Sequence, residues 1–119
     1  DPTQYEIIYK AYVVCTEEEE ALLENLNRVP WCRYMPEYVF VEPLDKARGI
    51  RRVMDHFGAD RGDVIVFGDG DNDLSMFTDE WTKVAMGNAT PRLTAKADLI
   101  TTSVEDDGIY NACVELGLF

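Results

Sequence analysis

Residues 64–73 read VIVFGDGDND, and the interpretation of the whole chain starts from this stretch. The apolar run at 64–67 predicts a buried strand, and the glycines after it allow the backbone to turn where a side chain would clash. Three carboxylates, those of Asp69, Asp71 and Asp73, then lie within five residues. They repel one another unless a cation or solvent separates them. Because Mg²⁺ prefers hard carboxylate oxygens, the loop is a candidate magnesium site.

The segment at 45–57 has the pattern of an amphipathic helix. Asp45 is suited to cap its start, and Gly58 is suited to end it. Its apolar side chains fall on one helical face, and these are Ala47, Ile50, Val53, Met54 and Phe57.

Strands and helices continue to alternate after the acidic loop. We expect strands at 82–86 and 99–102, a helix starting at Thr90-Pro91, and a terminal helix at 106–118 with Ile109, Ala112, Cys113 and Leu116 facing inward. Such alternation predicts right-handed crossovers and a Rossmann-like parallel sheet, which is an α/β fold. Ligands of these folds bind at the carboxyl ends of the strands, where Asp69 and Asn88 are expected.

The first 42 residues have a different, more antiparallel pattern. We expect a strand within 6–16, a helix that begins at 17–20 and carries Leu22, Leu23 and Leu26 on one side, and a hairpin at 31–41. Pro30 would end that helix. These residues are therefore expected to form a separate small lobe.

Composition narrows the classes of partner. The net charge is −12 and the isoelectric point is about 4.3, so nucleic acid and anionic membranes would be repelled. No apolar run approaches the roughly 20 residues of a membrane span, and no secretory signal opens the sequence. Cys15, Cys32 and Cys113 fit neither a disulfide framework nor a zinc site. Reduced cysteines and a cytoplasmic location are expected.

The acidic loop has a rival interpretation as a calcium loop. Asp69, Asp71 and Asp73 occupy positions 1, 3 and 5 of an EF-hand, and Glu80 occupies position 12. However, Leu74 stands at position 6, where the turn requires glycine, and an apolar strand precedes the loop. An acidic turn without any ligand is a further alternative.

Lys46 is a second candidate residue. A cation in the first turn of a helix opposes the helix dipole, and a bound anion would offset this. A solvated lysine is the simpler alternative.

Several segments together resemble the haloacid dehalogenase superfamily, and most closely its Cof-type sugar-phosphate phosphatase branch. Residues 67–76, FGDGDNDLSM, resemble its fourth motif, and residues 45–50, DKARGI, resemble the third, whose lysine holds phosphate. The similarity continues through AMGNA at 85–89, AD at 97–98 and EDDG at 105–108. The resemblance implies the second half of an α/β cap at 1–42 and the carboxyl-terminal part of the hydrolase core at 43–119.

The resemblance also implies roles for individual residues. The intact enzyme would be a Mg²⁺-dependent phosphatase that hydrolyses a small phosphate monoester, such as a sugar phosphate, through an aspartyl-phosphate. Lys46, Asp69 and Asp73 would be catalytic, with Asp69 a metal ligand and Asp73 a ligand directly or through water. Lys46, Asn72 and Asn88 would contact the phosphorylated substrate, or Asn88 would support the loop. Asp71 stands at the variable place of the motif and has no implied role.

The chain departs from the family in one important respect. The Asp-x-Asp motif that carries the nucleophile precedes the cap, and neither it nor the second motif, a phosphate-binding Ser or Thr, stands in this sequence. We therefore expect a carboxyl-terminal fragment that is inactive alone. A non-catalytic binding protein derived from the fold is the alternative. In the family the nucleophile strand lies beside the strand that ends at Asp69, so an open strand edge here predicts self-association or retention of a separate amino-terminal half.

Overall fold

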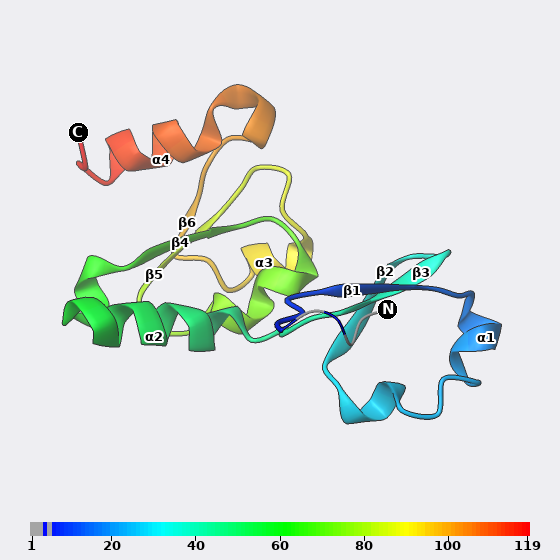
Figure 1. Ribbon diagram of the computed structural model, residues 1–119. Helices are drawn as coiled ribbons and strands as arrows, with labels where there is room; N and C mark the ends of the chain where they lie inside the picture. The colour runs from blue at the N-terminus through cyan, green and yellow to red at the C-terminus, as the bar shows by residue number, and fades with distance from the viewer. Residues whose placement is uncertain (1–3, 5) are drawn as a thin grey trace. The chain divides into compact units, whose positions relative to one another are not determined.

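The computed structural model describes residue 4 and residues 6–119, and the chain divides into two compact units, Asp1–Leu44 and Asp45–Phe119. Each unit has its own sheet and its own core (Figure 1). The division falls two residues after the boundary expected from the sequence. The interpretation of the units as part of a cap and part of a hydrolase core stays a prediction.

The first unit contains an antiparallel sheet of three strands in the order β1-β3-β2. The hairpin expected at 31–41 is present, with Tyr12 opposite Phe40 on one side and Trp31 opposite Val41 on the other. The strands are β1 Ala11–Val14, β2 Trp31–Met35 and β3 Tyr38–Val41. Its small core is formed by Cys15, Leu26 and Val39.

The helix expected after residue 16 is much shorter than predicted. α1 is a single turn, Glu17–Glu20, capped by Thr16, and only a 3-10 turn, Leu26–Arg28, follows. Four adjacent glutamates repel one another, and those at the carboxyl end oppose the helix dipole. The guanidinium of Arg33 forms an ion pair with Glu20 at 2.9 Å and also donates to the carbonyls of Cys15 and Thr16. Because Arg33 lies in β2, these contacts attach the turn to the sheet.

The second unit has a parallel sheet with strand order β4-β5-β6, which confirms the α/β class. The strands are β4 Ile65–Gly68, β5 Thr82–Ala85 and β6 Leu99–Ile100. The helices are α2 Lys46–Phe57, α3 Pro91–Thr94 and α4 Gly108–Glu115, with 3-10 segments at Arg61–Asp63, Asp71–Met76 and Val104–Asp106. None of the helices among the described residues has the length and apolar character needed to cross a membrane.

Two helix boundaries show how local signals act. Asp45 caps α2 by accepting from the amide of Arg48 at 3.0 Å, and Gly58 ends it with a φ of 63°, as predicted. α4 starts two residues later than predicted, because Asp107 adopts a left-handed φ of 55°. Ile109, expected to face inward, is 52% exposed, so that part of the prediction was wrong.

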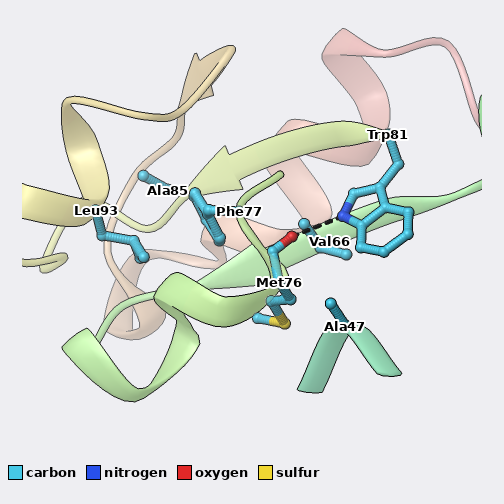
Figure 2. Close-up of a cluster of buried hydrophobic side chains, with 7 residues drawn as sticks. All are labelled: Ala47, Val66, Met76, Phe77, Trp81, Ala85 and Leu93. Atoms are coloured by element: carbon cyan, nitrogen blue, oxygen red, sulfur yellow. Dashed lines mark hydrogen bonds between the residues drawn. The ribbon is translucent and has the colours of Figure 1, made fainter. Parts of the chain in front are cut away.

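The core of the second unit lies between the sheet, α2 and the segment after the acidic loop, as Figure 2 shows. The indole Nε1 of Trp81 donates to the carbonyl of Met76 at 2.7 Å, so the buried polar atom of this ring is satisfied. The cluster consists of Ala47, Val66, Met76, Phe77, Trp81, Ala85 and Leu93.

β4 lies at an edge of its sheet within the described residues. Beside it runs an apolar groove of about 710 Å³ lined by residues of α2, Ala59, Asp63, Val64 and Ile65. Two residues of the predicted apolar face of α2 line this groove rather than a core: Val53 is 56% exposed and Phe57 is 76% exposed.

A lysine is buried in β5. The ammonium of Lys83 pairs with Asp79 at 3.0 Å and Asp98 at 3.3 Å, and its amide donates to Asp98 at 2.8 Å. The hydrogen bond that Lys83 donates to Asp79 raises the pKa of Lys83, burial opposes this, and Asp98 raises it further. The buried charge is therefore paired.

Candidate functional site

Polar side chains meet beyond the carboxyl ends of β4 and β5. The loop after β4 carries Asp69 and Asp73, and the loop after β5 carries Asn88. Gly68 ends β4, and a Cβ at this position would lie 2.8 Å from the ring of Phe77 and 2.9 Å from Cβ of Asp73. Glycine is therefore needed here because the loop folds back closely onto the strand.

Asp73 is the most tightly held carboxylate of the loop. Its Oδ2 accepts from the amides of Asp69 at 3.0 Å and Gly70 at 3.3 Å, and its Oδ1 accepts from Nζ of Lys46 at 2.5 Å. Burial raises the pKa of this carboxyl, but the hydrogen bonds from Lys46 and from the two amides outweigh burial and hold the pKa below its ordinary value. Asp73 is therefore an ionised, buried carboxylate.

Lys46 reaches Asp73 from the first turn of α2, 27 residues earlier in the sequence. Its amide donates to Oγ of Ser75 at 3.0 Å, which ties the start of α2 to the segment after the loop. The anion that offsets its unfavourable position in the helix is thus the carboxylate of Asp73. The side chain remains 45% exposed, so the ammonium can also contact a second anion from solvent.

Asn88 links three loops. Its Nδ2 donates to Oδ2 of Asp69 at 3.1 Å, and its Oδ1 accepts from the amide of Val104 at 3.2 Å. The amide of Thr90 donates to the carbonyl of Asp69 at 2.8 Å. Asp69 is therefore oriented by the loop after β5, while its Oδ1 has no hydrogen-bond partner in the part of the chain that the structure describes.

Asn72 stands apart from this network. It is exposed on the 3-10 segment Asp71–Met76, and among the described residues its side-chain amide donates to nothing. Of the residues implied by the family resemblance, Lys46, Asp69, Asp73 and Asn88 are linked by hydrogen bonds, and Asn72 is not.

Sequence reasoning missed the contacts of Asp71. Its Oδ1 accepts from the hydroxyl of Thr90 and its Oδ2 from Nη1 of Arg92, both at 2.7 Å. The hydrogen bond from Thr90 lowers the pKa of this carboxyl, burial opposes it, and Arg92 lowers it further. These contacts span 19 and 21 residues, so no local sequence pattern indicates them. The one available signal was that Thr90 and Arg92 place a hydroxyl and a cation two residues apart after the next strand.

The calcium-loop alternative does not match the arrangement of these side chains. Glu80, its twelfth position, pairs with Arg51 and accepts from Thr78, and a strand rather than a helix precedes the loop. Asp71 is bound to Thr90 and Arg92.

The donor chemistry fits a small, hard cation. Mg²⁺ is commonly held by one or two carboxylates, with water and substrate phosphate completing its shell. Asp69 and Asp73 supply two such carboxylates, and the backbone amide of Asp69 donates to Oδ2 of Asp73 at 3.0 Å. Within the described ranges, no three His, Cys, Asp or Glu side chains form a group that could hold a metal by themselves.

Comparison with known proteins identifies the family. The model of the haloacid dehalogenase-like hydrolases matches residues 7–113. The Bacillus subtilis protein named "Putative phosphatase YkrA" is 40% identical over 114 residues, which is 93% of this chain and 44% of that protein. The chain therefore belongs to the haloacid dehalogenase-like hydrolases, in the branch that the sequence indicated.

Solved structures agree with this family. A hypothetical protein from Geobacillus kaustophilus superposes with a TM-score of 0.85 and 37% identity, over 100% of this chain and 48% of that one. The sugar phosphatase BT4131 of subclass IIB superposes with a TM-score of 0.74 and 31% identity, over 96% of this chain and 45% of that one. The chain spans about half the length of these three relatives.

Proposed function

We propose that this chain supplies the carboxyl-terminal half of the active site of a Mg²⁺-dependent phosphatase that acts on a small phosphate monoester such as a sugar phosphate. The observation that carries the proposal is the pairing of Lys46 with Asp73 beside Asp69 at the end of β4. It brings a half-exposed ammonium and two carboxylates to one edge of a parallel sheet, where ligands of α/β folds bind. The names of the relatives support phosphate ester hydrolysis.

Each side chain has a defined part in this proposal. Asp69 holds the metal, and Asp73 contacts it directly or through water while it orients Lys46. Lys46 pairs with a phosphate oxygen as a point charge. Asn72, whose amide is exposed, donates to phosphate, and Asn88 keeps Asp69 in place. When bound, Mg²⁺ offsets the negative charge that develops on the phosphate oxygens.

The covalent step needs a residue from outside this chain. An aspartate in the missing half forms an oxygen–phosphorus bond while the bond from phosphorus to the substrate alcohol breaks, and water then hydrolyses the aspartyl-phosphate. The open edge of β4 and the apolar groove beside it are where we expect that half to pair. We place the protein in the reducing cytoplasm on the basis of its three free thiols.

Two proteins test the proposal together. The first is the present chain alone, and the second is a chimera in which the amino-terminal half of the Bacillus subtilis relative precedes it. With Mg²⁺ and p-nitrophenyl phosphate, the chain alone should show no turnover above the blank. The chimera should hydrolyse the ester, and Lys46→Ala or Asp69→Ala should lower its kcat by at least about 100-fold. Arg52→Gln, an exposed change on α2, is the matched control and should leave kcat unchanged.

Two results would contradict the proposal in different ways. Steady turnover by the chain alone, abolished by Asp69→Ala, would show that no nucleophile is missing. A folded chimera without activity on any phosphate monoester would refute the phosphatase function and favour a non-catalytic binding protein.

A further inference from the structure

We propose that Thr90 and Arg92 are specificity-determining residues that keep the carboxylate of Asp71 away from Asp69 and Asp73, so that the acidic loop favours Mg²⁺ over Ca²⁺. The inference rests on the proposed function, which places a divalent cation on Asp69 and Asp73. It concerns three side chains that the family resemblance leaves without a role.

The loop contains one carboxylate more than the two that Mg²⁺ commonly uses. Asp69, Asp71 and Asp73 stand at the positions of the first three carboxylate ligands in a calcium loop. A short loop rich in glycine can bring all three together on one cation. Ca²⁺ takes six to eight oxygens and its affinity rises with the charge of its ligands, whereas Mg²⁺ is satisfied by one or two carboxylates and water. A third free carboxylate would therefore help Ca²⁺ more than Mg²⁺.

In the structure, the carboxylate of Asp71 is bound to other side chains and is not available to a cation on Asp69 and Asp73. Both oxygens of Asp71 accept at 2.7 Å, one from the hydroxyl of Thr90 and one from the guanidinium of Arg92. The amide of Thr90 also donates to the carbonyl of Asp69 at 2.8 Å, so the same residue fixes the start of the loop. The direction of Asp71 is therefore set by the loop after β5.

Stability alone does not explain this contact. The side chain of Asp71 is 46% exposed and that of Arg92 is 73% exposed. Ion pairs this open to water are screened and contribute little to folding. Their effect is to hold a side chain in one direction, and here that direction determines how many carboxylates a cation meets.

The test measures the affinities of the metal-free chain for MgCl₂ and CaCl₂ by isothermal titration calorimetry. Thr90→Val combined with Arg92→Gln releases Asp71 and should raise the ratio of the Ca²⁺ to the Mg²⁺ association constant by at least about tenfold. Adding Asp71→Asn to this double variant should return the ratio to the original value. Arg92→Lys keeps the cation and should leave the ratio nearly unchanged.

Two controls distinguish the effect of releasing Asp71 from the effects of lost positive charge and of unfolding. Arg52→Gln removes one positive charge elsewhere in the unit and should change both affinities equally. Circular dichroism and unfolding curves should show all variants folded, since Thr90 and Arg92 are largely outside the core. If the double variant unfolds, the single changes Thr90→Val and Arg92→Gln each release one oxygen of Asp71 and carry the same test.

The outcomes distinguish this inference from the proposed function. An unchanged ratio in a chain that binds Mg²⁺ overturns the inference and leaves the metal site standing. A gain of Ca²⁺ binding on release, in a chain that does not bind Mg²⁺, overturns the preference for Mg²⁺ and also removes Mg²⁺ from the proposed function. If no variant binds either cation, the inference is refuted, and the activity of the chimera still tests the proposed function.

Discussion

Asp73→Asn should destabilise the second unit by about 2–3 kcal/mol at pH 7 in the presence of a chelator. The substitution keeps the size of the side chain and removes its charge. The single oxygen of asparagine can still accept from the amides of Asp69 and Gly70, but these bonds fall from charge-assisted to neutral, which costs roughly 1–1.5 kcal/mol each. The NH₂ group of the asparagine would face Nζ of Lys46. Because the side chain of Lys46 is 45% exposed, the lysine can turn toward water at little further cost.

The stability that Asp73 contributes should decrease as the pH falls. The folded pKa of Asp73 lies below its unfolded value, which is about 3.9. Its contribution to stability is therefore complete above the unfolded pKa and is lost as the pH falls through the folded pKa. The difference between the two proteins should be constant near neutrality and should shrink below about pH 4.

Urea unfolding followed by fluorescence measures this difference. In a Trp31→Phe background, only Trp81 reports, and it lies in the core of the second unit. Asp55→Asn is the matched control, because it removes an exposed carboxylate from α2 and should change the free energy of unfolding by less than about 0.5 kcal/mol. A loss below about 0.5 kcal/mol for Asp73→Asn, or a difference that grows on acidification, would refute the reasoning.

Three further predictions follow from packing and exposure. Gly49→Ala should stabilise α2 by about 0.5–1 kcal/mol in the same urea assay, because nothing lies within 4 Å of the added Cβ; a loss would show an unrecognised close contact. Gly108→Ala should destabilise by at least about 1–3 kcal/mol, since its Cβ would lie 2.2 Å from the carbonyl of Thr102; near-neutral unfolding would contradict this. The chain of 13.5 kDa should self-associate through β4 and the groove, and Val53→Glu or Phe57→Glu should shift it toward monomer in sedimentation. A wild-type chain that stays monomeric at all concentrations would exclude that contact.

The sequence predicted the parts of the fold that depend on neighbouring residues. Asp45 and Gly58 bound α2 because a cap and a left-handed residue act within one helical turn. The parallel pairing of β4, β5 and β6 followed from strands that alternate with helices, whereas their order was not predicted. The helix expected after residue 16 is only one turn long, and the contacts that hold this turn, from Arg33 to Glu20 and to the carbonyls of the two residues before it, come from another strand and have no local signal.

The candidate site divides in the same way. The family resemblance pointed to Lys46, Asp69, Asn72, Asp73 and Asn88. It did not reveal the pairing of Lys46 with Asp73, which spans 27 residues. Asp71 received no role, because its partners come from the next loop. Contacts of this length depend on how the sheet brings its loops together, and no local pattern encodes them.

The burial of Lys83 has a consequence for chemical labelling. Reagents that acylate lysine react with the neutral amine and need access to it, and the side chain of Lys46 is 45% exposed whereas that of Lys83 is 7% exposed. In the native protein, Lys46 can therefore react while Lys83 must wait until β5 separates from its carboxylate partners. Local openings of this kind differ in free energy from one region to another. The rate of acylation at Lys83, measured by mass spectrometry, therefore reports how often the parallel sheet opens at this residue.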